Sequence, residues 1–180
     1  MHRRHFVLGL LSALPVALSG CGYSLSGRGS FLPASIRIIA VPLFRNATSV
    51  YEVEQRVTER VRAELIGRGR WVVRPETEGA DAVLTGEITN VALTPAAFNQ
   101  QQLATRIVIT LVAKVELRDL KANKVVWSNP GLQFSETYDV ATASNSPNDP
   151  SVFLRSDINA LDRLATEFAR AVVGAMLEAF

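Results

Sequence analysis

The most regular pattern in this chain of 180 residues lies between residues 103 and 119, where apolar and other side chains alternate. A period of two places successive side chains on opposite faces of an extended chain. One face would then be nearly all apolar (Leu103, Thr105, Ile107, Ile109, Leu111, Ala113, Val115 and Leu117) and the other mixed (among them Arg106, Val108, Thr110, Val112 and Lys114). We therefore expect a long strand here, buried on one side.

Other segments have the composition of strands. Branched apolar residues dominate 36–44, where Pro42 should lie at a sheet edge or at the strand's end, and residues 45–48 should form a turn. The return strand 125–140 should be bulged or broken at Asn129-Pro130-Gly131. The remaining expected elements are extended segments at 71–73 and 80–93, turns at 75–79 and 121–124, and a polar loop at 94–102.

Two segments instead carry apolar residues at helical spacing. In the first, Ser49 and Glu52 fit a capping box, and Gly67 and Gly69 should end the helix. In the second, Asp149 is the expected cap, with Pro150 at the first helical position. The apolar stripes are Val50, Val53, Val57, Val61 and Leu65 in the first helix, and Ile158, Leu161, Leu164, Ala165, Phe168, Val172, Val173, Met176 and Leu177 in the second.

The order of elements, β-α-β-β-β-α, predicts a single α+β domain over residues 36–180. Two amphipathic helices would pack on one face of a mixed or antiparallel sheet of about four strands. The other face would carry the series that includes Val108, Thr110 and Val112, which is neither a dry core nor fully polar. Such a face is either covered by a partner or simply solvated, and the sequence leaves both alternatives open.

The N-terminus has the layout of a secretory signal over residues 1–20. Arg3 and Arg4 precede an apolar run that is too short for a spanning helix, and they fit both the general and the twin-arginine export routes. Leu18-Ser19-Gly20-Cys21 is the type of sequence that lipoprotein signal peptidase cleaves. The sequence thus predicts a lipoprotein with a diacylglycerol and an N-acyl chain on Cys21, in preference to an ordinary secreted protein.

Residues 21–35 follow the cleavage site and are rich in glycine and serine, so we expect a lipidated tether. Gly22 stands where an aspartate would be the usual signal for inner-membrane retention in enterobacteria. The absence of that aspartate favours the outer membrane as the destination.

The charge balance and the reactive side chains of the chain exclude several classes of function. The chain has 19 basic and 17 acidic residues; removal of Arg3 and Arg4 balances them at 17 each, so nothing indicates nucleic acid. His2 and His5 also lie in the signal, and Cys21 is consumed by lipid, which excludes Ser-His and Cys-His nucleophilic sites and His/Cys zinc sites. A hydrolase built on two carboxylates needs no histidine, but the acidic residues are scattered. We expect no enzyme and no cofactor besides the acyl chains.

The chain resembles the lipopolysaccharide-assembly lipoprotein family LptE. The resemblance lies in the combination of soft motifs, which together cover nearly the whole mature chain. They are CGYSL at 21–25, LP at 32–33, IIAVPLF at 38–44, NAT at 46–48, the glutamate-rich helix, ADAVLTG at 80–86, the two long strands and LDRLA at 161–165.

The resemblance implies an outer-membrane protein without covalent chemistry. Members plug the lumen of the large LptD β-barrel, help that barrel to fold, bind lipopolysaccharide and assist its insertion into the outer leaflet. A lipid A phosphate calls for a basic group beside apolar surface, and the candidates are Arg106, Lys121 and Lys124. The candidates for a partner-binding face are Phe98, Val108, Thr110 and Val112.

A second adaptor class remains as the alternative. Residues 41–48 and 80–86 also resemble periplasmic lipoproteins that activate peptidoglycan synthases, or lipoproteins of secretion pores. Activators of the first kind tend to need a longer, proline-rich linker to reach through the wall. The short tether after Cys21 therefore favours the LptE resemblance.

Overall fold

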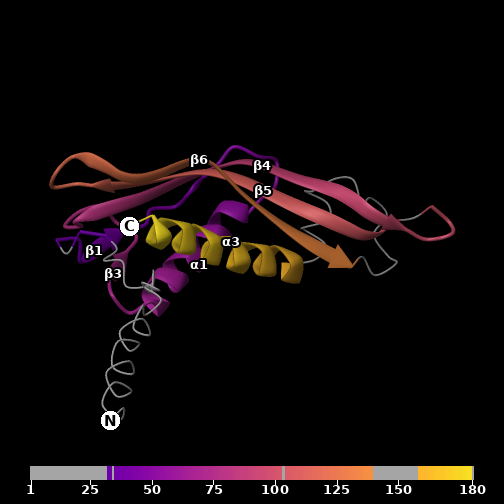
Figure 1. The fold of residues 1–180 in the computed structure, drawn as a ribbon, viewed down its shortest axis with the longest axis horizontal. Coiled ribbons are helices and arrows are strands. Elements are labelled where there is room, and N and C mark those ends of the chain that lie inside the picture. Colours follow the sequence, from indigo (N-terminus) through magenta and orange to yellow (C-terminus); the bar gives the residue numbers. More distant parts are fainter. Residues whose placement is uncertain (1–31, 34, 103, 140–157, 180) are drawn as a thin grey trace, which may run out of the picture.

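Three long strands form an extended antiparallel sheet, with two helices on one side of it (Figure 1). The computed structural model describes residues 32–33, 35–102, 104–139 and 158–179. Their strands are β1 (Ile38–Ala40), β2 (Arg45–Asn46), β3 (Val72–Arg74), β4 (Ala82–Phe98), β5 (Ala104–Asp119) and β6 (Lys124–Asp139), and their helices are α1 (Val53–Gly67) and α3 (Ile158–Glu178). The signal segment, Cys21, most of the tether and the Asp149-Pro150 helix start lie outside these residues.

The described strands form one mixed sheet of six strands in the order β3-β1-β4-β5-β6, with β2 also paired to β4. β1 runs parallel to β3 and β4, β2 runs parallel to β4, and β4, β5 and β6 are antiparallel. The α+β class is therefore confirmed, but the expected number of strands was too low. The extended segment expected at 71–73 is present as β3, displaced by one residue, whereas β2 has only two residues and is too short to leave a periodic pattern in the sequence.

The chain leaves the sheet between β1 and β2. The strand expected at 36–44 is present only as β1, and the turn expected at 45–48 is wrong in its first half, because Arg45 and Asn46 pair with β4 as β2. Pro42 lies just past the end of β1, as its lack of a backbone N–H predicts.

The start of α1 also differs from the prediction. Glu52 has a φ of 63° and makes no side-chain cap hydrogen bond, so the capping box from Ser49 is wrong. The turn is instead organised from Asn46 and Thr48: Asn46 Oδ1 accepts the Thr48 N–H at 2.9 Å, and Thr48 Oγ1 accepts the Val50 N–H at 3.2 Å. Such local bonds compete with helix initiation, so the helix begins only after Glu52.

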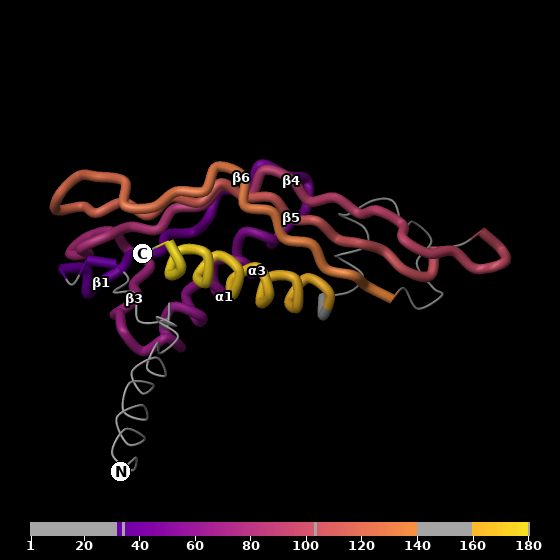
Figure 2. The backbone as a smooth tube through the Cα atoms, in the orientation of Figure 1, coloured from indigo at the N-terminus to yellow at the C-terminus, as the bar shows by residue number. Residues whose placement is uncertain are grey.

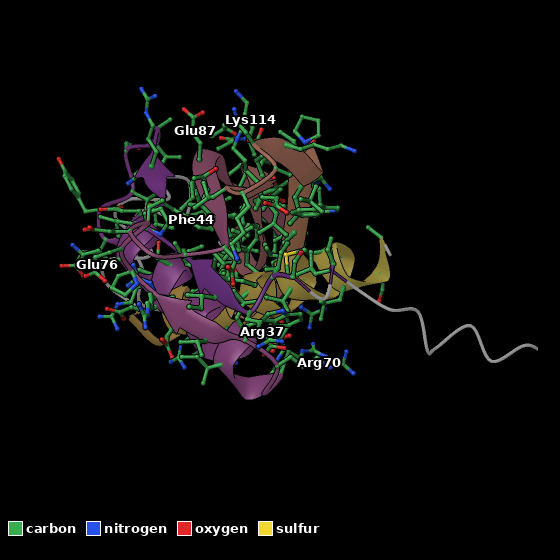
Figure 3. All side chains as sticks on the ribbon, turned by 90° about the vertical axis from the view of Figure 1, so that its left-hand side faces the viewer. Arg37, Phe44, Arg70, Glu76, Glu87 and Lys114 are labelled. Carbon is green, nitrogen blue, oxygen red and sulfur yellow. The ribbon has the colours of Figure 1, made fainter. Side chains whose placement is uncertain are left out.

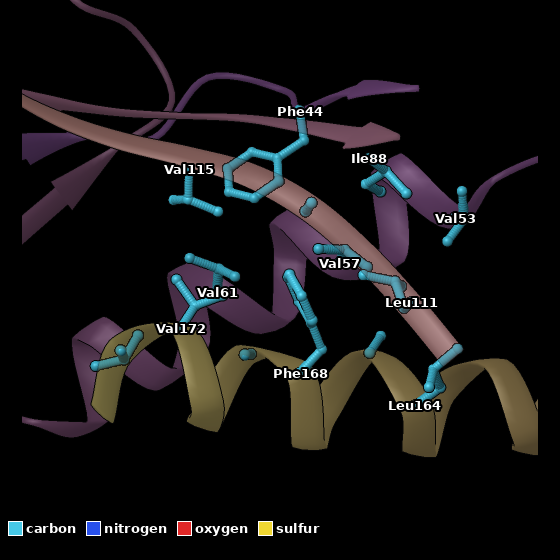
Figure 4. Close-up of a cluster of buried hydrophobic side chains, with 14 of the residues drawn as sticks. Phe44, Val53, Val57, Val61, Ile88, Leu111, Val115, Leu164, Phe168 and Val172 are labelled. Atoms are coloured by element: carbon cyan, nitrogen blue, oxygen red, sulfur yellow. The ribbon is translucent and has the colours of Figure 1, made fainter. Parts of the chain in front are cut away.

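Both helices pack on the same face of the sheet, as predicted (Figure 1). That face of β5 contributes a row of buried side chains, and fully buried Phe168 of α3 lies among residues of α1 and β5 (Figure 4). An ion pair between Arg60 of α1 and Asp162 of α3, with Nη2 and Oδ2 2.5 Å apart, joins the two helices at their partly exposed side. The core residues of β5 are Ile107, Ile109, Leu111, Ala113, Val115 and Leu117.

The hairpin between β4 and β5 projects beyond the described part of α3 (Figure 2). β4 continues to Phe98, so the first half of the loop expected at 94–102 is strand. β1 and β2 pair with β4 only as far as Ile88, and among the described strands the rest of β4 has a free edge. A free edge tolerates Pro95, which the sequence suggested as a loop residue, at the cost of a register shift before Ala97.

The predicted interruption of the return strand is confirmed in β6. Ala113 of β5 pairs with Leu132, but Val115 pairs with Asn129, so the register shifts at Asn129–Gly131. The Asn129 side chain accepts the Gly131 N–H at 3.0 Å and holds the bulge. A bulge bends its strand and increases the local twist.

Candidate interaction surface

The sheet face that points away from α1 and α3 has an uncharged centre, which we call the outer face. Val108, Thr110 and Val112 of β5 alternate with buried core residues and are partly buried themselves. Residues opposite one another in an antiparallel pair lie on the same face. The outer face is completed by Thr94, Ala92 and Asn90 of β4 and by Thr137, Ser135 and Gln133 of β6.

The outer face is able to form hydrogen bonds. Its side chains are small, β-branched or amide-bearing, and Thr110 Oγ1 lies 3.0 Å from Ser135 Oγ. None of the described elements lies over it (Figure 1). An unpaired charge is costly to bury, and a surface of this kind has none at its centre. It can therefore be buried against a partner.

Charged side chains border the outer face at both ends. At one end Arg106 Nε lies 2.8 Å from Asp139 Oδ1. At the other, the Glu87 carboxylate lies 3.8 Å from Arg45 Nε and 3.9 Å from Lys114 Nζ, and the side chains of Glu87 and Lys114 point away from the core (Figure 3). Glu87 and Lys114 also line a hollow of about 440 Å³ that reaches the β6 bulge.

The end of the β4–β5 hairpin combines an exposed aromatic ring with one basic group. No Asp, Glu, Lys or Arg occurs between Glu87 and Arg106 in the sequence. Phe98 is 58% exposed, and its neighbour Ala97 pairs with Arg106 of β5. Arg106 therefore meets the requirement for a basic group beside apolar surface.

Lys121 and Lys124 lie at the opposite end of β5, in and beside the turn to β6. Asp119, which pairs with Lys124, lies 13 residues beyond Arg106 on β5, so at about 3.3 Å per residue roughly 43 Å separates these lysines from Arg106. The structure thus brings the partner-face candidates Val108, Thr110 and Val112 together but divides the three basic candidates between two ends of the molecule.

Lys121 takes part in a junction around Asp81. Its Nζ lies 2.5 Å from Asp81 Oδ1, while Asp81 Oδ2 accepts the backbone N–H groups of Arg37 and Ile38 at 2.9 Å each. The hydrogen bond from Lys121, followed by the two backbone donors, holds the pKa of Asp81 well below its usual range. The junction joins the starts of β1 and β4 to the β5–β6 turn.

Sequence reasoning missed Arg45 and Glu87. Arg45 and Glu87 lie close together because β2 pairs with β4 over two residues. So short a strand leaves no periodic pattern in the sequence from which it could be predicted. The only signal was a basic residue directly after the apolar run 36–44.

The described residues present surfaces rather than reactive groups. Within that part of the chain, no three His, Cys, Asp or Glu side chains gather where they would hold a metal ion. Neither of its helices combines the length and the apolar character needed to cross a membrane. The arrangement is suited to binding through the outer face and the hairpin end.

A sequence profile of the lipopolysaccharide-assembly family LptE matches residues 36–176, which is most of the chain. The chain belongs to the LptE family. This LptE-family protein is therefore a member of a lipopolysaccharide-assembly family. No curated protein sequence matches it.

Solved structures of similar proteins include several lipoproteins. A PelC dodecamer from Paraburkholderia phytofirmans has 18% identity and a TM-score of 0.48, covering 80% of this LptE-family chain and 91% of that chain. A hypothetical protein from Chlamydia trachomatis has 13% identity and a TM-score of 0.49, covering 80% and 99%. The rare lipoprotein B from Shewanella oneidensis has 11% identity and a TM-score of 0.41, covering 77% and 93%. The family assignment rests on the sequence match.

Proposed function

We propose that this LptE-family protein is lipidated on Cys21 and anchored at the periplasmic side of the outer membrane. There it plugs the lumen of an LptD-type β-barrel, assists the assembly of that barrel and takes part in lipopolysaccharide insertion into the outer leaflet. The observation that carries the barrel partnership is the outer face, an uncharged, partly apolar sheet surface without a covering element among the described residues.

A barrel lumen is a suitable environment for this surface. Wide outer-membrane barrels have polar interiors, whereas narrow ones are filled by their own side chains. The hydroxyl and amide groups of the outer face can exchange hydrogen bonds with a polar wall. The bordering charges at Glu87, Lys114, Arg106 and Asp139 are already paired and lie at the rim.

The lipopolysaccharide contact in this proposal lies at the end of the β4–β5 hairpin. Arg106 would exchange its pairing with Asp139 for a lipid A phosphate, and the exposed Phe98 ring would meet the adjoining acyl chains. Lys121 and Lys124 are too far from Phe98 to bind the same phosphate.

Site-specific photocrosslinking tests the barrel partnership. A crosslinker placed in turn at Val108, Thr110 and Val112 in cells should capture an LptD-type barrel, because these side chains would face its wall. The matched control positions are Gln55 and Glu59, which are exposed on the solvent side of α1. Crosslinks at all three strand positions and none at the two control positions are the expected result.

Two outcomes would contradict the proposal. Equal crosslinking at the strand and control positions would mean that the outer face is not the binding surface. Recovery of a peptidoglycan synthase or a secretion pore in place of the barrel would favour the alternative adaptor class.

A further inference from the structure

The end of the molecule where the tether joins the fold gathers three segments that are distant in sequence. We call it the tether end, and it comprises Arg37, Arg68–Val72 and Lys121–Lys124. Leu32 belongs to the buried core, and Arg37 directly precedes β1. The Arg37 carbonyl accepts the Val72 N–H at 2.9 Å, and Asp81 links the Arg37 backbone to Lys121. Figure 3 views the molecule from this side, with Arg37 and Arg70 in its lower part.

The outermost charges of the tether end are positive. In the pair between Lys121 and Asp81 the side chains are 69% and 12% exposed, and in the pair between Arg68 and Glu64 they are 45% and 24% exposed. The cation is thus the outer member of each pair. Arg37, Arg70 and Lys124 add three further exposed cations.

Carboxylates also lie beside these cations. Asp119 is partly buried, and its Oδ1 accepts the N–H groups of Lys121 and Ala122 at 2.8 Å each. Glu178 lines a hollow of about 330 Å³ together with Arg68, Arg70, Trp71 and Leu177. Within the tether end all the charged side chains are cations, and the exposed carboxylates of Glu76, Glu78 and Glu178 lie outside it.

Apolar side chains accompany these cations. Ile66 is 57% and Val72 54% exposed, and Trp71 between the arginines and β3 is partly buried. Tryptophan and arginine have an apolar body and a polar end, which suits the boundary between lipid and water.

The tether keeps this end close to the membrane. Residues 22–31 separate Cys21 from Leu32. A chain of that length reaches at most about 40 Å when fully extended. Basic groups held this near to anionic lipids are attracted to their surface potential.

We propose that the tether end rests on the phospholipid headgroup layer of the membrane that holds the acyl chains of Cys21. Its arginines and lysines contact lipid phosphates, and Trp71 and Val72 lie at the interface. The inference rests on the lipidation proposed above, and adds to it a defined orientation of the domain on the bilayer.

The test uses the mature lipoprotein in vesicles that contain a lipid with a spin label on its headgroup. A fluorophore is attached at Ala122→Cys in the tether end or, as the control, at Gln101→Cys in the β4–β5 turn. Neither substitution alters a charge, and in the mature chain the only other cysteine is the lipidated one. In vesicles of phosphatidylglycerol and phosphatidylcholine, the label at 122 should be quenched and the label at 101 should not.

A charge variant supplies the second measurement. Replacing Arg37, Arg70 and Lys124 by Gln should lower the quenching at 122 about threefold, whereas replacing Arg45, Arg106 and Lys114 by Gln should leave it unchanged. Both variants leave the Lys121–Asp81 and Arg68–Glu64 pairs intact.

The outcomes separate this inference from the proposal on which it rests. A mass spectrum without acyl chains on Cys21 would contradict the anchor, and with it the inference. A lipidated protein that is quenched equally at 122 and 101 would overturn the inference alone, and so would quenching at 122 that is unchanged in pure phosphatidylcholine.

Discussion

Gly86 of β4 is the described glycine that leaves the least room for a side chain. A Cβ placed there would lie 2.3 Å from a ring carbon of Phe44, so the ring packs directly against the strand backbone. Phe44 is 2% exposed and lies over β5 beside Val115 in the core (Figure 4). The segment between β1 and β2 is thereby fixed to the sheet by one aromatic side chain.

Gly86→Ala should destabilise the protein by about 1–3 kcal/mol, because the ring has to move within a packed core. Chemical denaturation measures this free energy of unfolding. Gly174→Ala is the matched control: position 174 has no neighbour within 4 Å and lies inside α3, where alanine is favoured by up to about 1 kcal/mol. Equal effects of the two substitutions would contradict the assigned role of Phe44.

Asp81 should make stability depend on acid pH. Its pKa is lowered in the folded state, so its contribution is fully present above the ordinary carboxyl pKa of about 3.9 and is lost as the pH falls toward the folded value. Asp81→Asn should therefore melt at a lower temperature than the wild type near neutral pH, with the difference shrinking below about pH 4. A difference that is constant from pH 7 to pH 3 would rule out this linkage.

At the scale of elements, α1 and α3 are held together mainly by apolar packing. Phe168 is fully buried between them and the sheet, whereas the Arg60–Asp162 pair is 41% and 35% exposed. The pair raises the pKa of Arg60 and lowers that of Asp162, chiefly through the hydrogen bond between them. Solvent screening limits what such a pair adds to stability.

Phe168→Ala should accordingly cost about 3–5 kcal/mol, while a double-mutant cycle of Arg60→Ala and Asp162→Ala should give a coupling of at most about 1 kcal/mol. Both values come from denaturant unfolding. A coupling energy larger than the cost of Phe168→Ala would show that the ion pair, rather than the core, joins the helices.

How far the sequence predicts these elements depends on the range of the interactions that form them. The long strand, present as β5 (Ala104–Asp119), the turn, present at 120–123, and the end of α1 at Gly67 follow from local patterns in the sequence, and these elements are confirmed. β2 and the extension of β4 to Phe98 depend on pairing with distant segments, so composition misassigned them. The start of α1 failed because Asn46 and Thr48 organise the turn before it.

The candidate surfaces, too, could be predicted only where a local pattern in the sequence defines them. Alternation along β5 correctly grouped Val108, Thr110 and Val112 on one face. Which charged residues border that face, and which candidates share an end of the molecule, follow from strand register. Register links residues such as Arg45 and Glu87 across the sheet and is not visible in the chain order.

At the scale of the whole molecule, the tether end and the Phe98 hairpin lie at opposite ends of an elongated sheet (Figure 2). The β5 length of roughly 50 Å exceeds the thickness of a bilayer with its headgroups, about 40–45 Å. With the strands along the membrane normal, the proposed anchor at one headgroup layer would bring Phe98 and Arg106 to the opposite leaflet.

The outer face should contribute more than the lipid anchor to the stability of the barrel complex. Cys21→Ala should release the protein from the membrane fraction but leave barrel co-purification largely intact. Thr110→Lys should lower the recovery of the barrel more than tenfold, because it buries an unpaired charge in the contact. Gln55→Lys, on an exposed position of α1, should have no effect. An unlipidated protein that fails to bind the barrel would contradict this order.

The Asp81 junction also has a mechanical consequence. Tension on the proposed lipid tether would reach the fold through Leu32 and then β1, which lies between β3 and β4 with its hydrogen bonds across the strand direction. Pulling along β1 loads those bonds together in shear, and the Asp81 carboxylate adds two more at the point where the load arrives. The Asp81 carboxylate thus adds two hydrogen bonds at the point where the proposed tether would pull on the fold.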